Sequence, residues 1–135
     1  IMRTNIVQPI STIQCSANHV TNCKGYELCP RTVVMANWYA VHNDPTHWTK
    51  PEVFNPERFL DKNNCLNKDV HFTPFSMGKR KCAGIQLSQI ELFLMFATLL
   101  QQFEITPEED TGLPSLEPLL GSAAQEPQPH KARFI

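Results

Sequence analysis

One cysteine lies in a stretch of residues that is suited to holding a metal ion through sulfur. Cys82 follows three consecutive cations and lies between Gly78 and Gly84, and an apolar helical pattern begins at Ile85. Nearby Lys or Arg and a helix N-terminus both stabilise a thiolate, which is the form of cysteine that binds metals. Glycines can take positive φ and let a flat partner approach the backbone. The stretch therefore predicts a metal-ligating thiolate, with a buried structural cysteine as the ordinary alternative.

The same stretch resembles the haem-binding loop of the cytochrome P-450 family. That pattern is Phe, two residues, Gly, one residue, Arg, one residue, Cys, one residue, Gly, and its fixed places are filled by Phe75, Gly78, Arg80, Cys82 and Gly84. In this family a Cys thiolate holds the haem iron. The resemblance implies that Cys82 is the catalytic thiolate and the axial ligand of the iron of haem b. It also implies that Arg80 pairs with a haem propionate and that Phe75 packs beside the haem.

The segment after the loop predicts one long helix. Apolar residues recur at three- and four-residue spacing from Ile85 to Phe103, with a narrow polar stripe between them. A helix this apolar is expected to be buried on most sides. At 1.5 Å per residue it would span roughly 28 Å, enough to brace a porphyrin-sized cofactor. Pro107 ends any continuation.

A proline-rich segment before the loop predicts a coil anchored by arginine. The run Pro56-Glu57-Arg58-Phe59 resembles the core of the family's meander. Carbonyls of a coil need donors, and arginine offers five N–H groups in a rigid fork. The resemblance implies that Ile1-Met2-Arg3 closes a Glu-x-x-Arg motif whose glutamate would precede Ile1. Arg3 and Arg58 would then share a buried triad with that glutamate, whereas otherwise both are ordinary surface cations.

Short strands are expected in the first third of the chain. The β-branched run Val7–Ile13 resembles the strand that passes beside the haem and lines the substrate pocket, and Gln14 falls where the family often places a propionate-binding Arg or His. Residues His19 to Met35 predict strands around a turn at Asn22–Gly25. Arg31 takes the place of glycine in the family's Pro-Lys-Gly turn, which predicts a different turn geometry and some loss of stability.

The remaining segments predict one further helix and a long coil. Residues Ala36 to His42 are compatible with a helix before Asn43-Asp44-Pro45. From Pro107 onward the chain is rich in proline and glutamate and is expected to be coil. Residues Gly112 to Gly121 resemble the family's C-terminal loop, whose tip, near Leu119-Leu120-Gly121, would reach the substrate pocket.

Composition excludes several classes of protein. The 135 residues carry a net charge of −1 and 41% apolar residues, which argues against disorder and against nucleic-acid binding. The longest apolar run, Leu92 to Ala97, is far shorter than the ~20 residues that cross a bilayer, and no signal peptide is visible.

Cysteine and histidine spacing predicts no further metal site. Five cysteines at irregular spacing argue against a secreted disulfide framework. The possible zinc ligands near the start of the chain are Cys15, His19, Cys23 and Cys29. They contain no C-x-x-C pair, which argues against a zinc site. Other histidines match no metal spacing and are expected to lie on the surface or in packing contacts; they are His42, His47, His71 and His130.

The resemblance runs from Arg3 to about Leu120. Within the family, the sequence most resembles animal microsomal members that oxidise drugs and fatty acids. It implies a mainly α fold with small β-sheets (α+β), in which residues 1–135 form a partial cytochrome P-450 domain with meander, Cys loop and long proximal helix. The implied function is a haem-thiolate monooxygenase. Such an enzyme inserts one oxygen atom of O2 into a small apolar substrate, with electrons from an NADPH-dependent cytochrome P-450 reductase. Lys79 and Lys81 would face that reductase, unless they serve only solubility.

The resemblance also predicts what this chain lacks. It corresponds to roughly the last quarter to third of an enzyme of this family. The expected whole protein lies on the cytoplasmic face of the endoplasmic reticulum membrane, through an N-terminal anchor absent here. The distal helix that delivers protons to O2 is also absent, so we expect no monooxygenase activity and weak haem binding from the chain alone. A haem-thiolate isomerase or dehydratase and a non-enzymatic remnant are the alternative classes.

Overall fold

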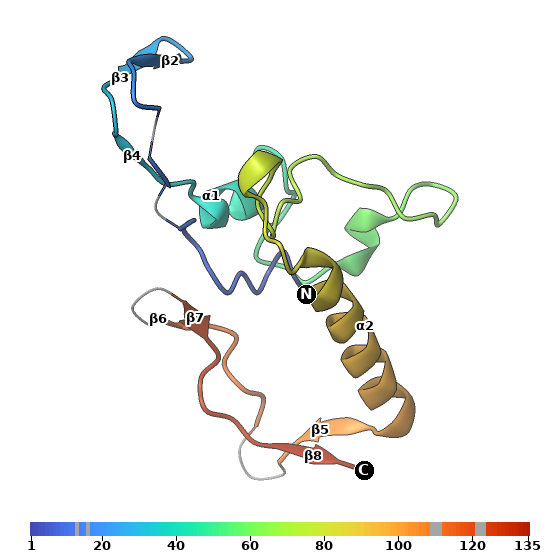
Figure 1. Ribbon diagram of the computed structural model, residues 1–135. Helices are drawn as coiled ribbons and strands as arrows, with labels where there is room; N and C mark the ends of the chain where they lie inside the picture. The colour runs from blue at the N-terminus through green and yellow to red at the C-terminus, as the bar shows by residue number, and fades with distance from the viewer. Residues whose placement is uncertain (13, 16, 109–111, 121–123) are drawn as a thin grey trace. The chain divides into compact units, whose positions relative to one another are not determined.

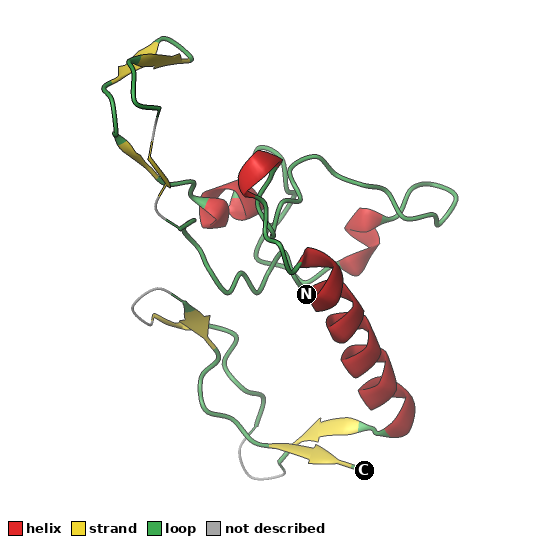
Figure 2. Cartoon of the chain, viewed as in Figure 1, coloured by secondary structure: helices red, strands yellow, loops and turns green. Residues whose placement is uncertain are grey.

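The computed structural model describes residues 1–12, 14–15, 17–108, 112–120 and 124–135, and it divides the chain into two compact units (Figure 1). The first unit is Ile1–Pro74 and the second is Phe75–Ile135. In these described ranges there are two α-helices and four two-stranded antiparallel sheets (Figure 2). This mixture of helices and small sheets confirms the predicted α+β class.

Two small sheets belong to the first unit. Strand β1 pairs with β4, and β2 pairs with β3 in a hairpin; their bounds are Gln14–Cys15, Val33–Val34, Thr21–Cys23 and Tyr26–Leu28. Lys24 and Gly25 form the hairpin turn with φ of 48° and 91°. Two successive positive φ values are typical of the tight hairpin turn that matches strand twist. The Asn22 Oδ1 accepts a hydrogen bond of 3.0 Å from the Gly25 N–H, so the predicted turn is confirmed.

The strand predicted over Val7–Ile13 is wrong in its described part. Those residues form a coil with a single bridge between Ile10 and Asn37. Pro9 has no N–H to give to a ladder, although its carbonyl accepts a 2.9 Å hydrogen bond from the Tyr39 N–H. Regular pairing begins only at Gln14, and Ile13 itself lies outside the described residues.

The predicted change of turn geometry at Arg31 is also wrong. Arg31 takes a φ of 62°, which is the left-handed conformation that a glycine adopts without cost. The turn therefore keeps the conformation expected of a glycine, and the arginine carries the strain. The Thr32 N–H and hydroxyl both donate to the Cys29 carbonyl, at 3.2 and 2.8 Å, and these bonds hold the turn in place.

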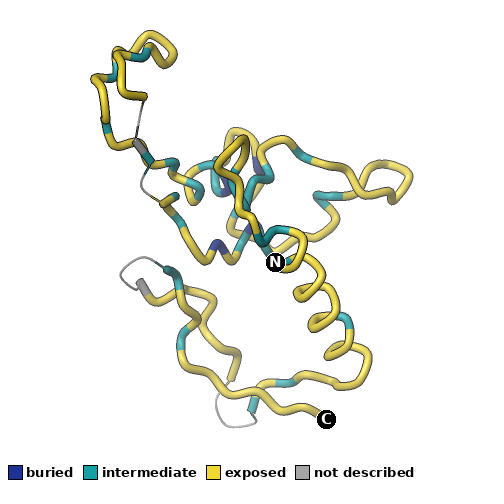
Figure 3. Tube along the Cα trace, in the orientation of Figure 1, coloured by how far each residue is buried: buried dark blue, intermediate teal, exposed yellow. Residues whose placement is uncertain are grey.

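A small core in the first unit forms around helix α1, Trp38–Asn43. Asn37 caps this helix by accepting a 2.9 Å hydrogen bond from the Ala40 N–H, and the predicted helix is confirmed. Among the described residues four are buried, and they are the dark segments of Figure 3: Arg3, Ile6, His42 and Trp48. Two of these four are polar, so polar contacts organise this core as much as apolar packing does.

The second unit contains the long helix and two more sheets. Helix α2 spans Ile85–Gln102, and the Phe103 N–H donates to the Leu99 carbonyl at its end. Strand β5 pairs with β8 and β6 pairs with β7; their bounds are Ile105–Pro107, Ala132–Phe134, Leu119–Leu120 and Gln125–Glu126. The coil predicted from Pro107 onward is therefore wrong where these strands lie. The predicted loop tip includes Gly121, which is outside the described residues.

The apolar side chains of α2 remain exposed in this chain. No residue of the helix is buried, and Phe93 and Met95 are 71% and 65% exposed. The burial predicted for this helix is thus not found within the 135 residues. In the described part of the chain, no helix combines the length and apolarity needed to cross a membrane.

Candidate functional site

A short loop at the start of the second unit presents Cys82. A 3₁₀ turn over Gly78–Arg80 leads into it. The Cys82 N–H donates a 2.9 Å hydrogen bond to the Phe75 carbonyl, and the Lys81 N–H donates a 3.3 Å bond to the Gly78 carbonyl. These bonds close the segment between Phe75 and Cys82 into a compact loop. Cys82 lies on its exposed surface as a free thiol.

The two glycines of the loop have different roles. Gly78 has a φ of 69° and open space where a Cβ would stand, so it is required for backbone conformation. Gly84 has a φ of −87°, which any residue can adopt. A Cβ on Gly84 would stand 3.9 Å from the Cys82 Sγ. That is an ordinary van der Waals distance, and no other atom lies within 4 Å of the position, so the space beside the sulfur is open. Positive φ explains Gly78 but not Gly84.

Helix α2 begins directly behind the thiol. Gly84 is its N-cap residue and accepts the first helical hydrogen bond, of 2.9 Å, from the Ser88 N–H. No side chain caps this end by a hydrogen bond, and the first N–H groups of a helix have no intrahelical partner. The positive end of the helix dipole therefore lies next to the segment that carries Cys82.

Three exposed cations border the thiol. Lys79, Arg80 and Lys81 are all exposed, and no ion pair joins any of them to another described residue. Together with the helix end, they make the loop electropositive. This arrangement favours an anionic partner next to the sulfur.

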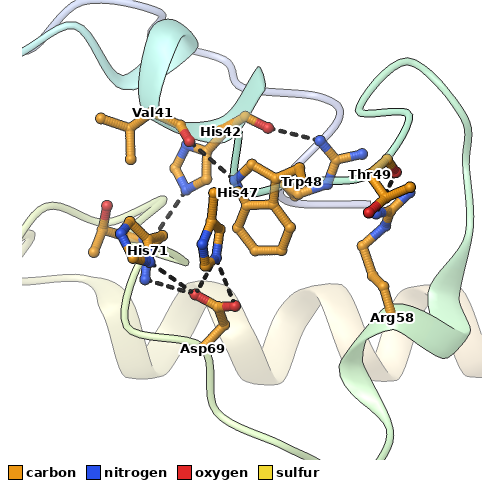
Figure 4. A network of polar contacts seen from close by, with 10 residues as sticks. Val41, His42, His47, Trp48, Thr49, Arg58, Asp69 and His71 are labelled. Atoms are coloured by element: carbon orange, nitrogen blue, oxygen red, sulfur yellow. Dashed lines mark hydrogen bonds and ion pairs between the residues drawn. The ribbon is translucent and has the colours of Figure 1, made fainter. Parts of the chain in front are cut away.

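Arg58 anchors the meander in the first unit, as predicted for a proline-rich coil. It follows Pro56 in a 3₁₀ turn, Pro56–Phe59. Its guanidinium donates to four carbonyls at 3.0 to 3.4 Å: those of Thr49, Lys50, Val53 and Asn55 (Figure 4 shows the side chain with Thr49). One side chain thus organises the coil from residue 49 to residue 55.

Arg3, near the N-terminal end of the chain, is buried and also binds carbonyls of this part of the first unit. Its Nη1 and Nη2 donate to the carbonyls of His42 and Pro51, both at 2.6 Å. Its guanidinium carbon lies 5.4 Å from the centre of the Trp48 ring, which is a cation–π distance. Burial lowers the pKa of Arg3, the charge of Arg58 lowers this pKa further, and Glu52 opposes the change.

His42 forms a buried hydrogen-bond network that sequence reasoning did not resolve. Its Nε2 accepts a 3.0 Å hydrogen bond from the Thr73 N–H, and its Nδ1 lies 3.0 Å from the Trp38 carbonyl. Since Nε2 must accept, Nδ1 carries the proton and donates to that carbonyl. Burial lowers the pKa of His42; the bond to Trp38 opposes this, and the charge of Arg3 adds to it. The ring is therefore held in its neutral form.

A second histidine group joins residues that are distant in the sequence. The His47 Nε2 lies 2.8 Å from the Asp69 Oδ2, and the His71 Nδ1 lies 3.4 Å from the Asp69 Oδ1 (Figure 4). Sequence spacing gave no sign of this contact. The signal available was only the pair Asp69-x-His71, which is too short to indicate a site by itself.

The predicted residues fall into both units. Phe75, Gly78, Arg80, Cys82 and Gly84 all belong to the second unit and form one loop, whereas Arg3 and Arg58 anchor the first. Gln14, which falls at the position where the family often places a propionate-binding Arg or His, lies in β1 opposite Val34.

Cys82 is thus an exposed free thiol between three cations and the start of a long helix. Residues 1–134 match the cytochrome P-450 family. The chain is 42% identical over 104 residues to the probable cytochrome P-450 CYP36A1 of Caenorhabditis elegans, covering 77% of this chain and 21% of that protein. It is 40% identical over 116 residues to cytochrome P-450 2U1 of Homo sapiens, covering 86% and 21%.

The fold agrees with the sequence match. A solved zebrafish cytochrome P-450 structure with abiraterone superposes with a TM-score of 0.87 at 34% identity, over 99% of this chain and 30% of that one. This chain belongs to the cytochrome P-450 family. It spans about a fifth of the length of the curated relatives it matches.

Proposed function

We propose that this chain provides the proximal, thiolate side of a haem-thiolate monooxygenase. One observation carries the proposal: Cys82 is an exposed thiol on a closed loop, and Gly84 leaves the space beside its sulfur open. A flat ligand needs such an approach to the sulfur. The membership of the family supports haem as that ligand, because members of the family hold haem iron through a Cys thiolate.

The residues of the loop fit a haem group. Cys82 would hold the iron, and Arg80 would pair with a propionate in a charge-assisted contact. Phe75, whose carbonyl already accepts the Cys82 N–H, would pack beside the haem. The N–H groups at the start of α2 would tune the electron density on the sulfur. When bound, haem b would supply the activation of O2 for insertion of one oxygen atom into an apolar substrate.

The exposed lysines support a proposal for the redox partner. Lys79 and Lys81 stand on the same loop as Cys82 and are free of ion pairs with described residues. An acidic surface of an NADPH-dependent reductase would complement them, and electrostatic complementarity steers such encounters. In this proposal the whole protein works on the cytoplasmic face of the endoplasmic reticulum membrane.

We also infer that the chain alone does not sustain turnover. The apolar side chains of α2 are exposed, and none of its residues is buried. Exposed apolar area of this extent in one helix is typical of a surface that packs against further protein. Haem binding by the 135 residues alone should therefore be weak, and the activity should require the longer protein that carries them.

The test compares wild-type protein with Cys82→Ser. Longer protein carrying this chain is loaded with haem, reduced and exposed to CO. We expect the red-shifted Soret band of thiolate ligation in wild type and its loss in the variant. An unchanged band in Cys82→Ser would overturn the assignment of the ligand. Product formation that requires NADPH, reductase and O2 would separate a monooxygenase from an isomerase or dehydratase.

The isolated 135-residue chain is measured in parallel. A stable thiolate band from this chain would contradict weak binding without affecting the role of Cys82. No band from the longer protein either, at full haem supply, would overturn the haem-thiolate proposal itself.

A further inference from the structure

Three metal-ligating side chains converge in the first unit. They are His47, from the turn after α1, and Asp69 and His71, from the segment that leads to Pro74. One ligand atom from each lies within 4.8 Å of the others. The rings of His47 and His71 lie against each other with centroids 3.7 Å apart and planes tilted by 36°, and the Asp69 carboxylate contacts both rings (Figure 4).

We propose that His47, Asp69 and His71 bind a zinc ion. The ligand atoms are the His47 Nε2, the Asp69 Oδ2 and the His71 Nδ1, and water fills the fourth position. Two imidazoles and one carboxylate with an open place form a ligand set that Zn²⁺ uses in proteins. The proposal gives these three residues no part in the reaction proposed for Cys82.

The spacing of the atoms is close to what zinc requires. Zinc bonds of about 2.0–2.2 Å in a tetrahedron put neighbouring ligand atoms roughly 3.3–3.5 Å apart. The His47 Nε2 and Asp69 Oδ2 are 2.8 Å apart, and the His71 Nδ1 approaches the other carboxylate oxygen, Oδ1, at 3.4 Å. Two imidazoles on one tetrahedral zinc have ring centres about 5 Å apart. Admitting the ion therefore requires the exposed His71 ring, now 3.7 Å from the His47 ring, to swing outward as the hydrogen bond between His47 and Asp69 opens.

The ligands are also held in orientation before any ion binds. The Asp69 Oδ1 accepts a 2.7 Å hydrogen bond from the His71 backbone N–H, which fixes the carboxylate with its Oδ2 2.8 Å from the His47 Nε2. The His47 ring packs at 90° against Trp48, with ring centres 4.7 Å apart, and Trp48 is buried. Contacts of this kind behind the ligands raise metal affinity, because the ligands lose less freedom on binding.

The surroundings provide room and negative charge. A cavity of about 340 Å³ borders His47, Trp48 and Asp69, which is ample for water ligands. Arg58 and Lys50 also border it, but the guanidinium of Arg58 is engaged with backbone carbonyls. The His47 backbone N–H donates a 3.1 Å hydrogen bond to the Asp44 carbonyl, so a second acidic residue lies next to this histidine in the chain's fold.

The experiment measures Zn²⁺ and Co²⁺ binding to the full chain after removal of metals with a chelator. The cysteines can bind zinc as well, so both test and control variants retain all of them. The test variant is His47→Ala/His71→Ala, and Asp69→Asn is a second one that keeps the shape of the side chain. The matched control is His19→Ala/His130→Ala, which removes two exposed histidines outside the cluster.

We expect wild type and control to bind one Zn²⁺ more than the test variants do, or the same ion at least about tenfold more tightly. Co²⁺ in this site should show ligand-field bands without the charge-transfer band of a thiolate. Zinc should also raise the midpoint of thermal unfolding in wild type and control but not in the test variants. Equal stoichiometry and affinity in test and control variants would overturn the proposal, as would thiolate bands alone. If Asp69→Asn binds zinc as wild type does, the carboxylate is not a ligand and the three-ligand site is wrong.

Discussion

Arg3 and Arg58 donate to adjacent carbonyls of one coil: the Arg3 Nη2 bonds the Pro51 carbonyl at 2.6 Å, and the Arg58 Nη2 bonds the Lys50 carbonyl at 3.4 Å. Two guanidinium groups therefore fix a coil segment that has no β-ladder hydrogen bonds of its own. Burial lowers the pKa of Arg3, and the like charge of Arg58 lowers this pKa further. Glu52 is the carboxylate that acts against this effect.

Replacing Arg58 with lysine should destabilise the first unit by about 1–2 kcal/mol. Lysine keeps the charge but lacks the planar fork, so it cannot reach four carbonyls at once. Urea unfolding followed by tryptophan fluorescence, from Trp38 and the buried Trp48 of the first unit, measures the change. Arg80→Lys, at an exposed position, is the matched control. Equal midpoints for the two variants would contradict the anchoring role.

The turn at Arg31 offers a stabilising substitution. Arg31 has a φ of 62°, and a left-handed conformation costs a residue with a Cβ roughly 1–2 kcal/mol. Arg31→Gly removes this strain but gains freedom in the unfolded chain, so we expect a net gain of about 0.5–1 kcal/mol in the free energy of unfolding. Arg31→Ala keeps the Cβ and should bring no gain. If alanine stabilises as much as glycine, strain at this φ is not the cause.

Local patterns predicted the features that short-range chemistry decides. The fixed spacing from Phe75 to Gly84, the periodic apolar residues from Ile85 and the turn at Asn22–Gly25 each determine structure within a few residues. The carbonyl bonds of Arg58 were likewise predictable, because a proline-rich coil must find donors.

Contacts between distant residues could not be predicted in the same way. The stacking of His47 on His71 depends on how the turn after α1 meets the segment near residue 70. The pairing of β5 with β8 joins Ile105 to Phe134, and no local pattern selects that partner. The Arg31 turn shows a related limit: the surrounding hydrogen bonds impose a conformation that the residue type disfavours.

His42 should make the stability of the first unit fall in acid. The folded protein needs the neutral ring, because Nε2 accepts from the Thr73 N–H, and burial lowers the pKa of His42. Its contribution is complete above the ordinary histidine pKa of about 6.5 and is lost as pH falls through the lower folded value. We expect the free energy of unfolding to drop more steeply between about pH 7 and 5 in wild type than in His42→Gln. His130→Gln serves as control and should keep the wild-type slope. Parallel pH profiles for wild type and His42→Gln would contradict the neutral, accepting ring.

Replacing each of the two glycines of the Cys82 loop with alanine should affect a different property, haem binding for Gly84 and stability for Gly78. Gly84→Ala meets no conformational barrier, because φ is −87°, but its methyl group would stand 3.9 Å from the Cys82 Sγ. It should therefore weaken haem binding with little change in unfolding. Gly78→Ala meets no atom within 4 Å but is strained at a φ of 69°, so it should destabilise the loop by about 1–2 kcal/mol. The two effects are measured by haem titration and by thermal unfolding of the longer protein carrying this chain. Ala83→Gly, at a position between the two glycines, is the control. Full haem affinity in Gly84→Ala would show that the open space beside the sulfur is not the route by which haem is bound.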